Sequence, residues 1–234
     1  LAGPNQLQLK KNVSLIKEKN YITEKICDLC LKNNLKLIYI SSMQVYSNYG
    51  KVDIYNNSKI DLKKSYSKSH IESEKIINQK FINKKNMFTI IRLGNVFGFK
   101  KYKNIREVNN NLINGFCISA LKKKKILIKD GSIQRTFVPS SIFFKLINFI
   151  IENNHFKNNI FNFSYKSFNL MQISMLIKKR IKTLYNLNIG VKIKKFNDKR
   201  IFFVKANKVF NIIPTNKKIY NEIDQILKEI KRSK

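Results

Sequence analysis

Apolar residues in this chain recur with two alternating periods, and that alternation limits the folds available to it. The helix-like segments are 13–33, 66–83, 109–121, 141–151, 170–184 and 218–230, and the short apolar runs typical of buried strands are 35–40, 87–93, 126–128, 160–163 and 191–196. A strand followed by a helix and another strand is the unit of a parallel sheet. We therefore expect an α/β fold built on a parallel sheet.

The apolar runs are too short for a membrane span. The longest, over residues 142–151, contains Lys145 and Asn148, and a bilayer requires about 20 apolar residues. The chain also shows no basic and then apolar N-terminal signal. We expect a cytoplasmic protein with no membrane partner.

The formal net charge of +33 is compatible with a nucleic acid, an anionic lipid or an anionic substrate. The abundance of Lys, Asn, Ile and Phe is what an AT-biased genome encodes, although that bias does not explain why Asp and Glu total only 14. No zinc-finger spacing, aromatic RNA-binding segment or basic heptad array accompanies the charge. We predict that nucleic acid is not a partner.

The pair Cys27 and Cys30 has the C-x-x-C spacing of redox and metal sites. It lies inside a helix-like segment, however, and the chain has no second cysteine pair and only two histidines. We predict that both thiols pack in the core and that no metal is bound.

Polar side chains occur in a fixed order where predicted strands end or helices begin. The segment IYISSMQVY ends a strand at Ser42, YSKSHIESE opens a helix with Tyr66 and His70, and IIRLGNVFG follows another strand with Asn95. Two later segments, KDGSIQRTFV and IFNF, contain Arg135 and Asn162. Each segment alone is compatible with a capped strand, a surface helix or a turn.

In this order the segments resemble the extended short-chain dehydrogenase/reductases, the NAD-dependent nucleotide-sugar epimerase/dehydratase family. The resemblance implies that residues 1–98 form the C-terminal part of a doubly wound, Rossmann-like parallel sheet, which the strand near 160–164 rejoins. Residues 99–234 would form a smaller, mainly substrate-binding α/β lobe. It also implies NAD or NADP as cofactor, a nucleotide sugar as substrate, and a homodimer that pairs through the helix beginning near Tyr66 and its neighbour.

The resemblance also implies catalytic roles. Tyr66 would exchange a proton with the sugar, and Ser42 would orient the reacting oxygen. His70 stands four residues after Tyr66, on the same helical face, where the family usually has lysine. A neutral imidazole can hydrogen-bond the cofactor ribose, but it supplies no charge to stabilise a tyrosinate.

The resemblance assigns substrate binding to Asn95, Arg135 and Asn162, with Arg135 offering a bidentate contact to a diphosphate. The 4,6-dehydratases of the family have an Asp-Glu pair directly after the catalytic hydroxyl. This chain has Met43 and Gln44 there, which cannot transfer the protons of an elimination. We therefore expect an epimerase or a keto-sugar reductase.

The seven glycines include no G-x-G-x-x-G turn, the motif that binds a pyrophosphate. The first five residues resemble the end of the family's fourth strand, so we expect the first three strands to lie upstream of Leu1 or to be absent from the native chain. Three hypotheses remain: an NAD(P)-dependent epimerase or reductase of nucleotide sugars for surface-polysaccharide precursors, a catalytically impaired or vestigial sugar-nucleotide-binding protein of the same fold, and a basic RNA-associated protein.

Overall fold

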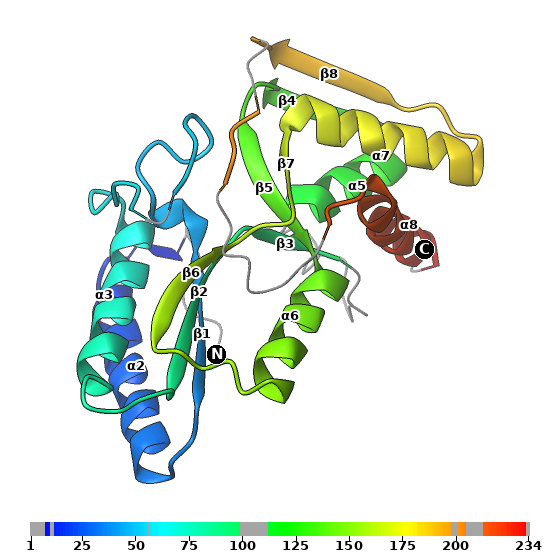
Figure 1. Ribbon diagram of the computed structural model, residues 1–234. Coiled ribbons are helices and arrows are strands. Elements are labelled where there is room, and N and C mark those ends of the chain that lie inside the picture. The colour runs from blue at the N-terminus through cyan, green and yellow to red at the C-terminus, as the bar shows by residue number, and fades with distance from the viewer. Residues whose placement is uncertain are drawn as a thin grey trace. The chain divides into compact units, whose positions relative to one another are not determined.

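The computed structural model describes residues 8–9, 12–55, 57–98, 112–197, 201–204 and 213–232. Helices and strands alternate along these residues (Figure 1). In chain order they are α2 (Leu15–Lys32), β1 (Leu37–Ser42), the 3-10 helix η1 (Met43–Val45), α3 (Ser65–Lys80), β2 (Phe88–Leu93), β3 (Asn95–Phe97), α5 (Leu112–Lys123), β4 (Lys125–Asp130), β5 (Gln134–Pro139), α6 (Ser140–Glu152), β6 (Asn159–Phe163), β7 (Lys166–Asn169), α7 (Leu170–Tyr185), β8 (Gly190–Lys195) and α8 (Asn216–Arg232).

The chain divides into two compact units. Among the described residues, the first unit holds those up to Gly94, then 148–163 and Val204, and the second holds the rest. The sequence analysis predicts this boundary after Gly98 and assigns the strand near 160–164 to the N-terminal domain. The predicted strand end at residues 1–5 and the start of the helix predicted from residue 109 lie outside the described residues.

A parallel sheet in the order β1-β2-β6 forms the centre of the first unit. Its register aligns Ser42 with Leu93 and Arg92 with Asn162. The middle of β2 is apolar and inaccessible to solvent at Ile90 and Ile91, as expected of a strand that is covered on both faces. This parallel sheet and its helices confirm the predicted α/β, Rossmann-like fold.

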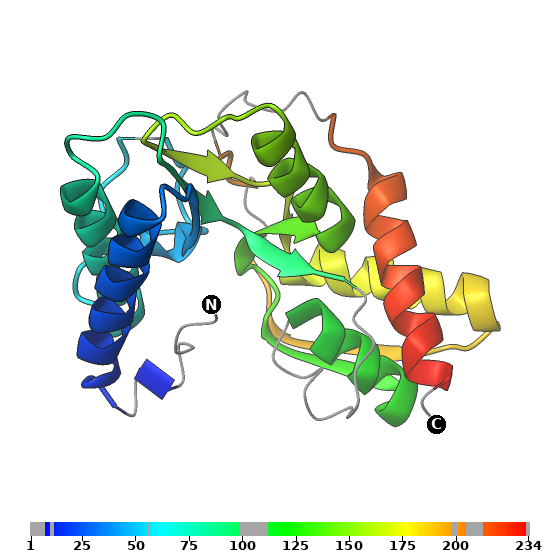
Figure 2. The same cartoon turned by 90° about the horizontal axis from the view of Figure 1, so that it is seen from below.

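Helices α2 and α3 pack against each other beside this sheet (Figures 1 and 2). Cys27 and Cys30 of α2 lie in a core cluster with Ile77, Phe81 and Phe88, and both thiols are free. Further along the same helix pair the contact is polar, since the hydroxyl of Thr23 lies 3.3 Å from that of Ser73. The cysteines are therefore part of the packing between the helices and the sheet.

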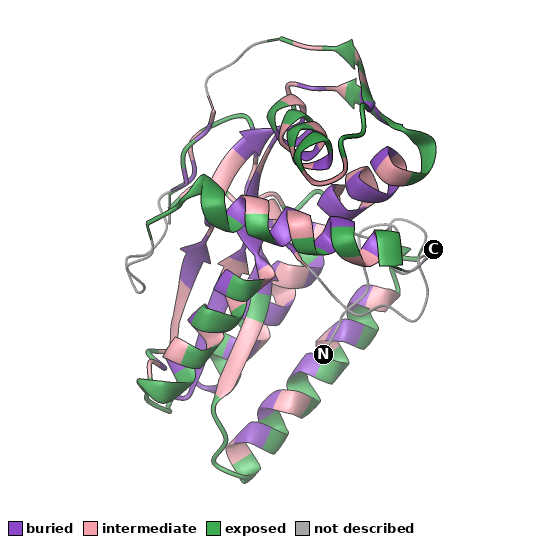
Figure 3. Cartoon of the chain, turned by 90° about the vertical axis from the view of Figure 1, so that its right-hand side faces the viewer, coloured by how far each residue is buried: buried purple, intermediate pink, exposed green. Residues whose placement is uncertain are grey.

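The second unit contains two further sheets. Strands β3 and β5 are parallel and β7 joins β5 antiparallel, while β4 and β8 form a parallel pair. Buried and exposed residues alternate along the helices, as α8 shows in Figure 3, because each helix turns one apolar stripe inward. Helix α7 begins with a capping box between Asn169 and Gln172, which satisfies two amide groups of its first turn.

The predicted helices match the observed ones, but the short strands β3, β5 and β7 differ from the sequence prediction. The sequence analysis predicts no strand at residues 95–97, 134–139 or 166–169. In the structure β3 and β5 pair in parallel before α6 begins, and β7 joins β5 antiparallel. No helix of the described residues is long and apolar enough to cross a membrane.

Candidate active site

The first candidate residue, Ser42, lies at the carboxyl end of β1. This is the edge of a parallel α/β sheet at which ligands bind. Ser42 is extended, and its hydroxyl accepts a hydrogen bond from the backbone N–H of Gln44 at 3.2 Å, which fixes the start of η1. The side chain is thus held in place where the strand ends.

Tyr66 and His70 face each other on the first two turns of α3. Their ring centroids are 4.7 Å apart in an edge-on arrangement, as the four-residue spacing requires. The hydroxyl of Ser42 neighbours the Tyr66 side chain. Burial raises the pKa of Tyr66, and the Ser42 hydroxyl opposes that rise. The structure therefore brings together the three residues that the sequence predicted as catalytic.

Burial and, to a lesser extent, the positive charge of Lys19 lower the pKa of His70 to about 3. The neutral imidazole is therefore the favoured form at ordinary pH. The Nδ1 atom lies 3.4 Å from the hydroxyl of Tyr39 on β1. Sequence reasoning left open whether this histidine carries a charge, and its surroundings favour the uncharged form.

Lys19 is a residue of the site's surroundings that the sequence analysis missed. Its side chain comes from α2 and is buried, with Nζ 3.4 Å from the hydroxyl of Ser69 and 5.9 Å from the centroid of the Tyr39 ring. Burial lowers the pKa of Lys19 to about 8, against the raising effect of Glu74. The signal was present in the sequence, because Lys19 falls on the helical stripe of Ile16, Thr23 and Cys27, where an apolar residue is expected.

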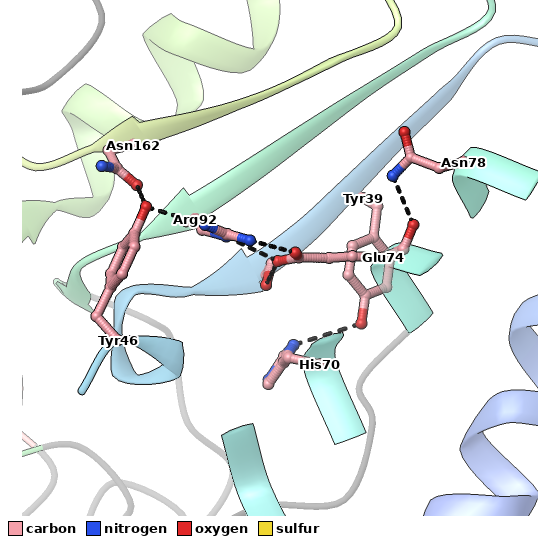
Figure 4. A network of polar contacts seen from close by, with 8 residues as sticks. Tyr39, Tyr46, His70, Glu74, Asn78, Arg92 and Asn162 are labelled. Carbon is pink, nitrogen blue, oxygen red and sulfur yellow. Dashed lines mark hydrogen bonds and ion pairs between the residues drawn. The ribbon is translucent and has the colours of Figure 1, made fainter. Parts of the chain in front are cut away.

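A buried polar network lies next to these residues (Figure 4). It connects β1, β2, β6 and α3. Arg92 of β2 donates to both carboxylate oxygens of Glu74 on α3 and to the hydroxyl of Tyr46. Tyr46 in turn donates to Asn162 of β6 at 2.7 Å. Asn162 is only 1% exposed, and its substrate-binding role stays a prediction.

Asn95 and Arg135 belong to the second unit. The amide of Asn95 donates to the carbonyl of Thr136 at 3.0 Å and ties β3 to β5. Arg135 is half-buried on β5, where Nη1 donates to the carbonyl of Gln134 at 2.7 Å. The proposed contacts of both residues with a diphosphate stay predictions.

A parallel sheet with helices beside it and a Ser–Tyr pair at the carboxyl end of a strand together define the class of the short-chain dehydrogenase/reductases. The family model described as the NAD dependent epimerase/dehydratase family matches residues 3–163. The chain therefore belongs to the NAD-dependent epimerase/dehydratase family. Among curated proteins, none matches the chain.

Solved structures of this kind share the fold at low sequence identity. A UDP-N-acetylglucosamine 4-epimerase from Bacillus cereus is 17% identical with a TM-score of 0.74, over 97% of this chain and 73% of that one. A UDP-glucose 4-epimerase from Bifidobacterium longum, in complex with NAD+ and UDP, is 15% identical with a TM-score of 0.76, over 99% and 75%. The protein RMD from Pseudomonas aeruginosa, complexed with NADPH, is 13% identical with a TM-score of 0.76, over 100% and 80%.

Proposed function

We propose that this protein is an NAD(P)-dependent epimerase or keto-sugar reductase of nucleotide-activated sugars, and that it works best as a reductase. The observation that carries the proposal is the placement of Tyr66 next to the Ser42 hydroxyl and against the imidazole of His70, whose pKa is lowered by burial. All three groups are uncharged at neutral pH. Ser42 and Tyr66 can therefore donate hydrogen bonds, and Tyr66 can also donate a proton, whereas the neutral imidazole of His70 has one N–H donor and one acceptor nitrogen.

The raised pKa of Tyr66 sets the direction of proton transfer. A tyrosine that keeps its proton is ready to donate it to the oxygen of a keto group as that group is reduced. Ser42 orients the same oxygen with its hydroxyl, and Tyr66 regains its proton from solvent after each turnover. An epimerase would also need Tyr66 to remove a proton from a sugar hydroxyl, which a raised pKa makes harder.

The donor set fits a nicotinamide nucleotide. Tyr66 and His70 are half-buried and lie on one face of α3, and His70 has a ring nitrogen suited to a ribose hydroxyl. The cofactor, NAD(H) or NADP(H), supplies the hydride when it is bound. We assign the first unit to cofactor binding and the second mainly to the substrate.

A nucleotide sugar is the substrate class that the relatives support. The Bacillus cereus protein is named for a UDP-sugar, and the Bifidobacterium longum structure holds UDP with NAD+. The excess of positive charge in this chain suits an anionic diphosphate. Asn95, Arg135 and Asn162 are the candidates for binding it. A cytoplasmic location, a homodimer and a role in surface-polysaccharide synthesis stay predictions.

The experiment is to give the full chain NADH or NADPH with a UDP-4-keto-sugar and to follow cofactor oxidation. We expect Tyr66→Phe to reduce turnover by a factor of about 10² to 10⁴, the usual contribution of a general acid, while UDP-sugar binding changes little. Tyr21→Phe is the control, because Tyr21 is exposed on α2. Turnover by Tyr66→Phe at the rate of the control would overturn the proposal.

A catalytically impaired sugar-nucleotide-binding protein is the second candidate, and the identity of residue 70 favours it. Where the family usually has lysine, His70 is neutral and cannot stabilise a tyrosinate. This candidate predicts binding of UDP-sugars by calorimetry with no turnover in either direction. It also predicts that His70→Lys increases activity by a large factor, whereas the reductase proposal requires activity in the unaltered chain.

A further inference from the structure

Tyr39 lies next to His70 in the site, but neither the sequence motifs nor the proposed reaction gives it a role. It projects from β1 toward α3, and its hydroxyl oxygen is 3.4 Å from Nδ1 of His70 (Figure 4). The two rings meet edge to face, with centroids 6.3 Å apart and an interplanar angle of 62°. Histidine tautomers are set by the hydrogen bond that one ring nitrogen makes, so this contact determines what the other nitrogen can do.

The hydrogen atom on the Tyr39 hydroxyl has two available acceptors. Burial raises the pKa of Tyr39, so the hydroxyl keeps its proton throughout the neutral range. One acceptor is Nδ1 of His70 at 3.4 Å, and the other is the neighbouring hydroxyl oxygen of Ser73. Ser73 donates its own hydrogen to the carbonyl of Ser69 at 3.0 Å, and the hydroxyl of Thr23 approaches its oxygen at 3.3 Å. Ser73 keeps a lone pair that could accept, but the contact of the Tyr39 hydroxyl that has hydrogen-bond geometry among the described residues is the one with Nδ1 of His70, so we infer that the hydrogen points to His70.

The charges around the pair oppose a second proton on the imidazole. Lys19 of α2 lies over the Tyr39 ring, and its positive charge repels an imidazolium. The carboxylate of Glu74 on α3 accepts hydrogen bonds from Arg92 of β2 and from Ser41 of β1. It is therefore engaged elsewhere and does not serve as a counter-ion for His70.

The geometry points to Tyr39 as a positioning residue that donates to Nδ1 and holds His70 as the neutral tautomer with its proton on Nε2. His70 then offers one N–H donor of fixed direction. Among the described residues, no other hydrogen-bond partner of the His70 imidazole is present. The use of this donor toward a cofactor ribose rests on the proposed function, whereas the tautomer does not.

The test is ¹⁵N NMR of the imidazole side chains in the full chain at neutral pH. The chain has two histidines, so His155 provides an internal reference. We expect Nδ1 of His70 to have the chemical shift of an unprotonated acceptor and Nε2 that of an N–H group. Tyr39→Phe removes only the hydroxyl, and we expect the His70 signals to move toward those of a tautomer mixture. Tyr21→Phe, the matched control, should leave them unchanged.

The spectrum of the unaltered protein can overturn the inference without any variant. A proton on Nδ1 would mean that Tyr39 donates to Ser73 instead, and a doubly protonated ring would mean that His70 is charged. Signals of Tyr39→Phe that equal those of the unaltered protein would likewise remove the role of Tyr39.

Adding NADH separates this inference from the proposed function. If both hold, the Nε2 signal of His70 shifts on addition of NADH and the signals of His155 do not. If the tautomer is as expected and NADH shifts neither histidine, the ribose contact and the proposed function fail. The Tyr39–His70 assignment would then stand on the spectrum alone.

Discussion

Arg92 and Glu74 form a bidentate ion pair in the interior of the first unit. Nε of Arg92 lies 3.1 Å from one carboxylate oxygen and Nη2 lies 2.7 Å from the other. The two side chains are only 11% and 4% exposed. Ser41, the neighbour of Ser42, donates to the same carboxylate at 2.6 Å. The pair therefore holds α3, which carries Tyr66 and His70, against the strand ends.

We predict that Glu74→Gln lowers the free energy of unfolding by about 3–5 kcal/mol, because it leaves the guanidinium of Arg92 buried without a counter-charge. Urea denaturation measures the loss. The control is Asp28→Asn, which breaks the solvent-exposed ion pair between Asp28 and Lys80 and should cost far less, because water screens exposed charges. Equal losses in the two variants would contradict a special role for the buried pair.

The long helices could be predicted from the sequence because their apolar stripes are local patterns. The predicted helix 13–33 corresponds to α2 at Leu15–Lys32, and the helix 170–184 to α7 at Leu170–Tyr185. Strands β3, β5 and β7 could not, because β3 and β7 are short and all three depend on pairing between segments far apart in the chain. Strand β5 also contains Gln134, Arg135 and Pro139, which give no strand signal.

Part of the site was predictable for a similar reason. Ser42 ends a strand, and the spacing of Tyr66 and His70 places them on one face of a helix, so local rules were enough. The contacts of Tyr39 with His70 and of Tyr46 with Asn162 join residues far apart in the sequence. Only the folded sheet brings them together. The sequence analysis also missed Lys19, although its place on the helical stripe of Ile16, Thr23 and Cys27 was a local signal of burial.

We predict that Lys19→Met raises the pKa of His70, because the variant removes the positive charge that opposes protonation of the imidazole. The new value should still lie below the ordinary 6.5, since burial is the larger cause of the shift. A pH titration followed by NMR of the histidine side chains measures it. Lys17→Met, at an exposed position of the same helix, should leave the titration unchanged. Identical titrations in the two variants would show that Lys19 does not act on His70.

We predict that Cys27 reacts slowly with iodoacetamide in the folded protein. Burial raises the pKa of Cys27 from 9.0 to about 12, with the neighbouring Cys30 as a further cause, and only the thiolate is a nucleophile. At about pH 8 the thiolate fraction should be on the order of 10³-fold below that of a free thiol. Mass spectrometry of peptides after timed labelling, with the urea-unfolded chain as control, measures the rate. Labelling at equal rates in both states would mean that the fold neither buries the Cys27 thiol nor lowers its reactivity.

The low pKa of His70 also predicts how stability depends on pH. The unfolded chain takes up a proton at this residue below about pH 6.5, whereas the folded protein does so only near pH 3. Stability is therefore lost as the pH falls through this window, by on the order of 1 kcal/mol per pH unit from this residue alone.

His70→Asn removes that contribution, so the variant should gain stability relative to the unaltered protein as the pH falls from about 7.5 to about 5. Urea unfolding at the two pH values measures the difference. His155→Asn, at a residue whose pKa is lowered less, should gain less. A His70→Asn difference that does not change with pH would show that the folded protein binds the proton as readily as the unfolded chain.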